Sequence, residues 1–169
     1  MNTHINNMRL SIDKAAQDVV QLLHHKQIIL STAESCTGGL LSGALTGVSG
    51  SSQVFNFGIC AYANEVKQHL LGVNAQTLAK FGAVSAECAA EMAVGARRIS
   101  NGIAAISVTG IAGPGGGTAE KPTGTVYFAC SFRKKLNVLH LEINPDYGRE
   151  YIRLESVRQA LILILNTIS

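Results

Sequence analysis

The sequence predicts an α/β fold, a three-layer α/β/α sandwich with a mixed, mostly parallel sheet. Segments with helical periodicity alternate with short apolar runs, and two strand-like runs follow each other directly only near the end of the chain. The 169 residues suit one domain, and they contain no internal repeat and no low-complexity linker. We therefore expect a single domain over residues 1–169, with residues 1–9 as a flexible tail.

The first half of the chain predicts helices and strands in alternation. Apolar residues recur on one helical face over residues 10–25, where Ser11 is a candidate helix cap. The elements expected next are a buried strand over 27–32, a helix of small residues ending near Thr46, a polar loop over 48–52, a strand over 54–62, and a helix over 65–71 capped by Asn64.

The second half predicts two more helices, one buried strand and a hairpin. Its buried strand is the clearest in the sequence, because residues 103–109 are apolar except near their end. The other elements expected are a short helix over 74–81 closed by Gly82, a helix from the cap Ser85 to about Ser100, strands over 125–132 and 136–143, and a last helix over 149–168.

Composition and charge exclude several classes of protein. A formal net charge of +3 is too small for a broad nucleic-acid-binding face, and solvation at a hairpin turn explains the cluster Arg133-Lys134-Lys135. The four cysteines form no C-x-x-C pair and have no histidine at ligand spacing, so we expect free thiols and no metal. No apolar segment resembles a signal peptide or a membrane span. We expect a cytoplasmic protein that binds neither nucleic acid nor membrane.

Three loops are candidates for a ligand site. In sheets of this type, ligands bind beyond the carboxyl ends of the parallel strands. The rule selects the loops that follow Leu30, Ala61 and Val108.

The first loop offers Ser35 in a turn between a strand and a helix. We expect the main-chain N–H groups of Thr37, Gly38 and Gly39 to point outward there without partners, where they would stabilise a phosphate or an oxyanion. The alternative is that Ser35 or Thr37 only caps the helix.

The second loop offers Tyr62 and Lys67. Lys67 falls near the third helical position, where the helix dipole and partial burial would lower its pKa and leave a neutral amine. A solvated surface lysine is the alternative. The pair does not match the Y-x-x-x-K spacing of short-chain dehydrogenases, because four residues lie between Tyr62 and Lys67.

The third loop, residues 109–124, is too long and too rich in glycine to be a simple connector. Its N–H groups could bind a phosphate, although it matches neither the P-loop nor G-x-G-x-x-G. Lys121 is a candidate phosphate partner, and simple solvation is the alternative.

The histidines argue against a Ser-His-Asp triad. All five lie in the predicted tail, helices or hairpin, away from the glycine-rich loops. If Ser35 attacks a substrate, a lysine or tyrosine is therefore the better base. Cys36 is a rival nucleophile, because thiols near helix N-termini are acidified.

Four stretches in order resemble the CinA C-terminal domain family. The residues 32–39 read TAESCTGG, and the other stretches are 48–52, 62–67 with 71–73, and 110–114 with 121–126; residues 82–85 fit as well. The resemblance covers residues 10–165. It implies a three-layer α/β/α domain with nicotinamide-nucleotide amidase activity, which converts nicotinamide mononucleotide to nicotinic acid mononucleotide and ammonia in pyridine-nucleotide salvage.

The resemblance also implies roles for individual residues. The serine, tyrosine and lysine of the family carry over to Ser35, Tyr62 and Lys67, with no metal and no cofactor. The substrate-binding residues that we expect are Glu34, Thr37, Gly38, Gly39, Ser51, Ser52, Thr109, Gly110, Ala112, Gly113, Lys121 and Arg149.

One stretch departs from the family pattern, which has G-D-R-x-x-I-R before the last helix. Here Tyr147-Gly148 replaces Gly-Asp, while Arg149 and Arg153 stay in register. The departure leaves two alternatives to the amidase: a nucleotide-binding regulatory module without turnover, and an amidase for another small amide. The last helix carries more apolar residues than one face needs, so we expect a homodimer or a higher homo-oligomer.

Overall fold

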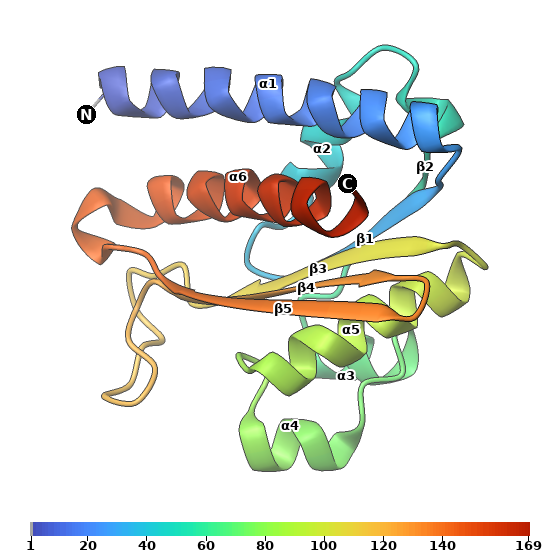
Figure 1. Cartoon of the computed structure of the whole chain (residues 1–169). Coiled ribbons are helices and arrows are strands. Elements are labelled where there is room, and N and C mark those ends of the chain that lie inside the picture. Colours follow the sequence, from blue (N-terminus) through green and yellow to red (C-terminus); the bar gives the residue numbers. More distant parts are fainter. Residues whose placement is uncertain (1) are drawn as a thin grey trace.

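The computed structural model describes residues 2–169 and shows a five-stranded mixed sheet with helices on both faces (Figure 1). β1 pairs in parallel with β2 and β3, whereas β4 pairs antiparallel with β3 and β5. The predicted α/β sandwich is confirmed. The strands, in their order across the sheet, are β2 (Phe55–Cys60), β1 (Leu30–Glu34), β3 (Ala104–Gly110), β4 (Thr125–Phe132) and β5 (Lys135–Glu142).

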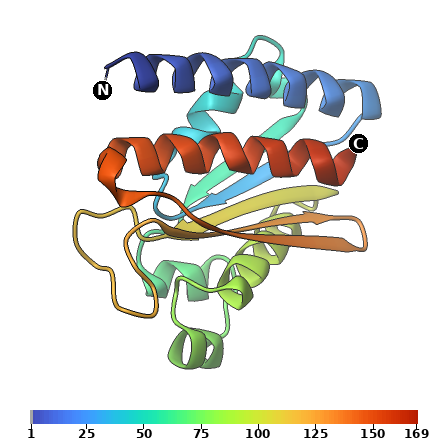
Figure 2. The same cartoon turned by 60° about the vertical axis from the view of Figure 1, so that its left-hand side comes forward.

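The helices form one layer on each face of the sheet (Figures 1 and 2). The main apolar core lies between the sheet and the first layer, where Leu23, Phe128 and Leu161 are almost completely buried. A smaller core, which contains Met92, lies under the second layer. The first layer holds α1 (Asn2–Lys26), α2 (Leu40–Thr46) and α6 (Gly148–Ile168), and the second holds α3 (Asn64–His69), α4 (Ala75–Phe81) and α5 (Ala86–Ile99).

The first helix begins earlier than the sequence predicts. Residues 2–9, which we expected as a tail, form the first turns of α1, and Met1 lies outside the described residues. Ile5 and Met8 continue the apolar spacing of α1 and pack against the main core. Ser11 therefore lies inside the helix and does not cap it.

Other boundaries differ in detail. Gln27 adopts a φ of +54°, and β1 begins only at Leu30, later than predicted. The strand ends at Glu34, so Ser35 directly follows it. Asn64 is the first residue of α3 and forms no side-chain cap, contrary to the prediction. Asn74 and Ser85 do accept main-chain hydrogen bonds at the starts of α4 and α5, and the Ser85 cap was predicted.

α6 packs against both α1 and the sheet, and this position explains its apolar composition. Ile152, Leu161 and Ile164 are completely buried in the main core. Burial within one chain therefore accounts for most of the apolar residues on which the expected homo-oligomer depended, and that expectation stays a prediction.

The strand register brings the three predicted loops together at the carboxyl ends of the parallel strands. Glu34, the last residue of β1, is level with Cys60, the last residue of β2, and with Val108, two residues before the end of β3. The Ser35 nitrogen donates a hydrogen bond to the Val108 oxygen (2.9 Å), and the Ala61 nitrogen donates one to the Glu34 oxygen (2.8 Å). The loops that follow β1, β2 and β3 thus start at the same end of the sheet.

Candidate active site

The turn after β1 is built around the side chain of Glu34. Its carboxylate accepts hydrogen bonds from the main-chain nitrogens of Gly39 (3.0 Å), Leu41 (3.1 Å) and Ser42 (2.8 Å), and from the Ser42 hydroxyl (2.6 Å). These donors lie at the start of α2, where N–H groups have no partner within the helix. Because Glu34 is fully buried and its oxygens are occupied in this way, its assignment to substrate binding is wrong. It caps α2.

The two glycines of this turn are already engaged. Gly38 and Gly39 have φ values of +59° and +94°, a region that favours glycine. The Gly38 nitrogen donates to the Ser35 oxygen (3.1 Å), and the Gly39 nitrogen donates to Glu34. The prediction that these N–H groups point outward without partners is therefore wrong for both glycines. The Thr37 side chain is fully buried.

Arg153, on α6, holds the same turn from the other side. Its Nε donates a hydrogen bond to the carbonyl of Cys36 (3.1 Å), and its terminal nitrogen donates one to the carbonyl of Thr37 (2.8 Å). A Cβ on Gly38 would lie 3.2 Å from this guanidinium, so glycine leaves the arginine its space. The position of Ser35 thus depends on α6 as well as on β1.

Lys67 is the fourth residue of α3 and is only 1% exposed. Its Nζ donates a hydrogen bond to the main-chain oxygen of Tyr62 (3.0 Å). Burial lowers the pKa of this amine, because desolvation penalises the charged form. The predicted direction of the pKa shift is confirmed.

Ser35, Tyr62 and Lys67 line one cavity of about 210 Å³ at the carboxyl edge of the parallel strands. Among residues 2–169, no hydrogen bond joins the Ser35 hydroxyl to Lys67 or Tyr62, and the Tyr62 side chain is 65% exposed. All three predicted loops contribute to this cavity. Its other lining residues are Cys36, Asn64, Ala83, Val84, Thr109, Gly110, Ala112 and Arg149.

The glycine-rich loop is fixed to the link between α4 and α5. Lys121 Nζ donates hydrogen bonds to the carbonyls of Phe81 (2.6 Å) and Val84 (2.7 Å), and Thr109 Oγ1 donates one to the carbonyl of Ala83 (2.8 Å). Lys121 therefore positions the loop and does not line the cavity, and its assignment as a phosphate partner stays a prediction.

Arg149 is the cation that reaches the cavity from α6. One of its guanidinium nitrogens donates a hydrogen bond to the Gly113 carbonyl. A guanidinium carries several N–H donors in a planar fork that suits phosphate. Because Arg149 is exposed, further donors can reach an anionic ligand. Gly113 itself supports Arg149 and does not line the cavity.

Ser51 and Ser52 lie near the amino-terminal ends of β1 and β2, at the end of the sheet opposite the cavity. They belong to a 3₁₀ turn (Ser51–Gln53) that precedes β2, and the next residue, Val54, accepts a hydrogen bond from the Leu30 nitrogen at the start of β1 (2.8 Å). The candidate nucleophile follows the other end of β1. The assignment of both serines to substrate binding in this cavity is therefore wrong.

Cys36 lines the cavity beside Ser35, but its thiol is protected from ionisation. Burial raises the pKa of Cys36 to about 12, which outweighs the acidifying effect expected near a helix N-terminus. At neutral pH this residue is a neutral thiol. The choice of Ser35 over Cys36 as the candidate nucleophile gains support from this pKa.

The departure from the family pattern changes the entry into α6. The Tyr147 ring packs against Tyr151 with 4.6 Å between ring centroids, and Gly148 has a φ of +81°, which favours glycine. Neither Tyr147 nor Gly148 lines the cavity, whereas Arg149 does.

Sequence reasoning missed several residues of the site. Asn64 was interpreted as a helix cap, and Arg153 was placed in register without a role. Ala83 and Val84 lie between two helices, where the rule about strand ends cannot find them, although residues 82–85 belong to the recognised pattern.

The fold and the cavity define an α/β protein whose candidate active site combines a serine with a buried lysine. The chain belongs to the CinA C-terminal domain family, whose model matches residues 12–168. It is similar to the solved competence/damage inducible protein CihA from Agrobacterium tumefaciens, with a TM-score of 0.90 and 44% identity over 92% of this chain and 94% of that one. A CinA superfamily protein from Klebsiella pneumoniae gives a TM-score of 0.88 and 32% identity over 93% and 97% of the two chains.

Curated relatives are longer than this chain. The CinA-like protein of Thermotoga maritima is 42% identical over 149 residues, which are 88% of this chain and 36% of that protein. The CinA-like protein of Synechococcus sp. is 46% identical over 152 residues, which are 90% and 36% of the two proteins. The chain therefore spans about a third of the length of these relatives.

No helix within residues 2–169 is long and apolar enough to cross a membrane. The same part of the chain contains no group of three or more His, Cys, Asp or Glu side chains that could hold a metal ion.

Proposed function

We propose that the protein hydrolyses the carboxamide of nicotinamide mononucleotide to nicotinic acid mononucleotide and ammonia, as part of pyridine-nucleotide salvage in the cytoplasm. The observation that carries the proposal is the position of Lys67, a buried amine with a lowered pKa, in the cavity that Ser35 also lines. A serine hydroxyl needs a base in order to attack an amide, and a neutral lysine is one such base. The resemblance to the amidase family supplies the substrate.

In the first step, the Ser35 hydroxyl attacks the carboxamide carbon and passes its proton to the neutral Lys67 amine. The hydroxyl and the amine do not touch in the free protein, so a water molecule, or Tyr62 at the mouth of the cavity, relays this proton. Lys67 then gives the proton to the departing amino group, which leaves as ammonia. The nicotinoyl group stays on Ser35 as an ester.

In the second step, water hydrolyses this ester. Lys67 is neutral again and takes a proton from the water molecule, whose oxygen attacks the ester carbon. The proton returns to the Ser35 oxygen, and the acid product leaves. The reaction consumes one water and requires no metal or cofactor.

Both steps create a negative oxygen that needs hydrogen-bond donors. Gly38 and Gly39 are engaged elsewhere, so the N–H groups near Ala112 or the amide of Asn64 supply these donors in our proposal. Such a donor typically stabilises the transition state by about 3–4 kcal/mol. Arg149 binds the 5′-phosphate.

Ammonia release from nicotinamide mononucleotide by the purified protein tests the proposal. We expect equal amounts of ammonia and nicotinic acid mononucleotide, and much slower release from nicotinamide, which lacks the ribose phosphate that Arg149 would bind. A second candidate function is a nucleotide-binding module without turnover, which the missing contact between Ser35 and Lys67 favours. Calorimetry that shows tight binding of the nucleotide together with no ammonia release would establish that alternative. Release from unphosphorylated amides alone would point to another amidase.

The expected homo-oligomer is a separate proposal. Size-exclusion chromatography with light scattering tests it, because a species of the monomer mass at all concentrations would reject it.

A further inference from the structure

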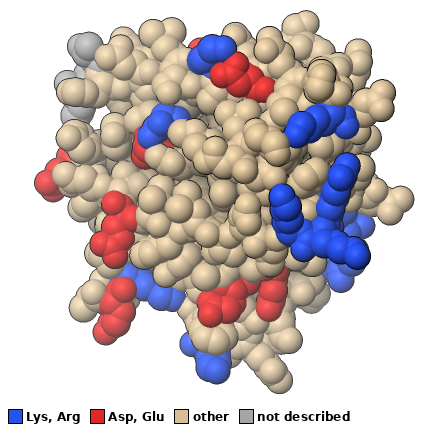
Figure 3. Space-filling model, viewed as in Figure 1, with Lys and Arg blue, Asp and Glu red and all other residues tan. Residues whose placement is uncertain are grey.

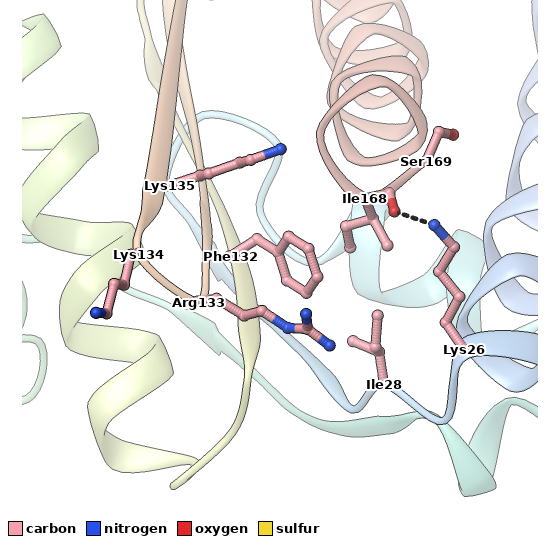
Figure 4. A pocket seen from close by; sticks show the side chains of 8 residues that line it. All are labelled: Lys26, Ile28, Phe132, Arg133, Lys134, Lys135, Ile168 and Ser169. Carbon is pink, nitrogen blue, oxygen red and sulfur yellow. Dashed lines mark hydrogen bonds between the residues drawn. The ribbon is translucent and has the colours of Figure 1, made fainter.

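A second cavity, of about 660 Å³, lies near the amino-terminal ends of the parallel strands, opposite the candidate active site (Figure 4). It is bounded by the turn between β4 and β5, the end of α6 and the segment that joins α1 to β1. In Figure 1 this turn lies at the right, while the glycine-rich loop beside the candidate active site lies at the left. The two cavities share no lining residue.

Four cations line this second cavity, namely Lys134 in the turn between β4 and β5 and three others. Lys26 comes from the end of α1, Arg133 from the turn, and Lys135 from the start of β5. No Asp or Glu side chain lines the cavity, and none of the four cations forms an ion pair within residues 2–169. Ser169 also lines the cavity. Figure 3 shows lysine and arginine side chains gathered on the corresponding side of the molecule.

The floor of the cavity is apolar. Phe132, Ile28 and Ile168 point into it from β4, the segment before β1 and the end of α6 (Figure 4). The Arg133 guanidinium lies over the Phe132 ring, 5.1 Å from its centroid, and this contact holds the cation at the rim. A concave apolar floor with a few convergent polar groups, in this range of volume, is typical of sites for small molecules.

Each of these cations also has an ordinary structural role, and solvation at the hairpin turn is that role for Arg133 and Lys135. Lys26 donates a hydrogen bond to the carbonyl of Ile168 (2.6 Å) and so balances the negative end of α6. Arg133 and Lys135 lie on no helix. Arg133 has a φ of +53°, where glycine or asparagine is favoured in a turn, yet the sequence places an arginine there.

We propose that this cavity is a second ligand site, which binds a small organic phosphate with a flat apolar group, such as a nucleoside monophosphate. Arg133 and Lys135 bind the phosphate, with Lys26 nearby, because several N–H donors match a doubly charged anion better than a single carboxylate. The apolar group packs beside the Phe132 ring and on the methylene stems of the lysines, because Ile28 and Ile168 are only 1% exposed. This proposal does not depend on the proposed amidase activity.

Calorimetric titration with AMP tests the proposal, with adenosine and inorganic phosphate as partial ligands. We expect AMP to bind, and each partial ligand to bind at least tenfold more weakly. The double variant Arg133→Glu with Lys135→Glu should lose at least tenfold in AMP affinity. Lys80→Glu is the matched control, because this exposed lysine on α4 does not line the cavity, and it should change the affinity less than threefold.

Two further variants separate the possible results. Arg149→Ala should leave the AMP affinity unchanged, since Arg149 belongs to the other cavity. Arg133→Asn with Lys135→Ala suits the turn better than charge reversal does, and it repeats the test in case the double Glu variant does not fold. The proposal is overturned if AMP does not bind, or if only Arg149→Ala weakens its binding. It is also overturned if Lys80→Glu weakens AMP binding as much as the two double variants do, or if phosphate alone binds as tightly as AMP.

Discussion

The replacement Glu34→Ala should destabilise the protein strongly, because one buried carboxylate accepts four hydrogen bonds at the start of α2. Hydrogen bonds to a charged acceptor contribute about 1.5–3 kcal/mol each. The four bonds share one side chain and are not additive, so we expect a loss of about 3–5 kcal/mol in the free energy of unfolding. For a chain of this size, the melting temperature should fall by about 6–20 °C.

Urea unfolding followed by circular dichroism measures this loss. Glu87→Ala is the matched control, since Glu87 lies in the first turn of α5 but is exposed, and it should lose only about 0.3–1 kcal/mol. If Glu34→Ala and Glu87→Ala lose the same amount, then Glu34 is not the cap of α2, and its assignment to the ligand site becomes open again.

Three further replacements test the site itself. Burial lowers the pKa of Lys67, so the unfolded chain holds this proton more tightly than the folded one. Lys67 therefore costs stability at neutral pH, and this cost fades as the pH rises toward the ordinary lysine value of 10.5. Lys67→Met should therefore raise the melting temperature at pH 7 while lowering kcat about 10²–10⁴-fold. In the wild type, kcat/KM should rise with pH with an apparent pKa below 10.5. This rise should be absent in Lys67→Met. Arg153→Met frees the carbonyls of Cys36 and Thr37 and should lower kcat about tenfold with little change in KM. Arg9→Met is the exposed control. If it lowers the melting temperature and kcat as much as Arg153→Met does, the positioning role of Arg153 is contradicted. Arg149→Ala should raise the KM for nicotinamide mononucleotide about 10–100-fold with a smaller effect on kcat, and an unchanged KM would exclude Arg149 from phosphate binding.

Local patterns predicted most of the fold and the centre of the site. Periodicity identified the helices and strands, and the rule about strand ends brought together the loops that carry Ser35, Tyr62 and Thr109. The direction of the pKa shift of Lys67 was predicted, and burial is what lowers this pKa in the structure. These features depend on short stretches of sequence and on the topology of parallel strands.

The errors concern residues whose partners are distant or were unknown. Glu34 belongs to a recognised motif and looked like a ligand contact, yet it accepts hydrogen bonds from the main chain of the fold. Ser51 and Ser52 also belong to such a motif, but the motif does not tell which end of the sheet it occupies. Arg153 reaches residues that are 116 and 117 positions away, a contact that no local pattern reveals.

The comparison of kcat for Ser35→Ala and Cys36→Ala in the ammonia assay tests most directly whether Ser35 is the nucleophile. Both neighbours line one cavity, but only Ser35 is the proposed nucleophile. We predict that Ser35→Ala loses ammonia release, while Cys36→Ala keeps a kcat within a few-fold of wild type. The reverse pattern, or turnover that survives in Ser35→Ala, would contradict the account of a serine activated by a buried lysine.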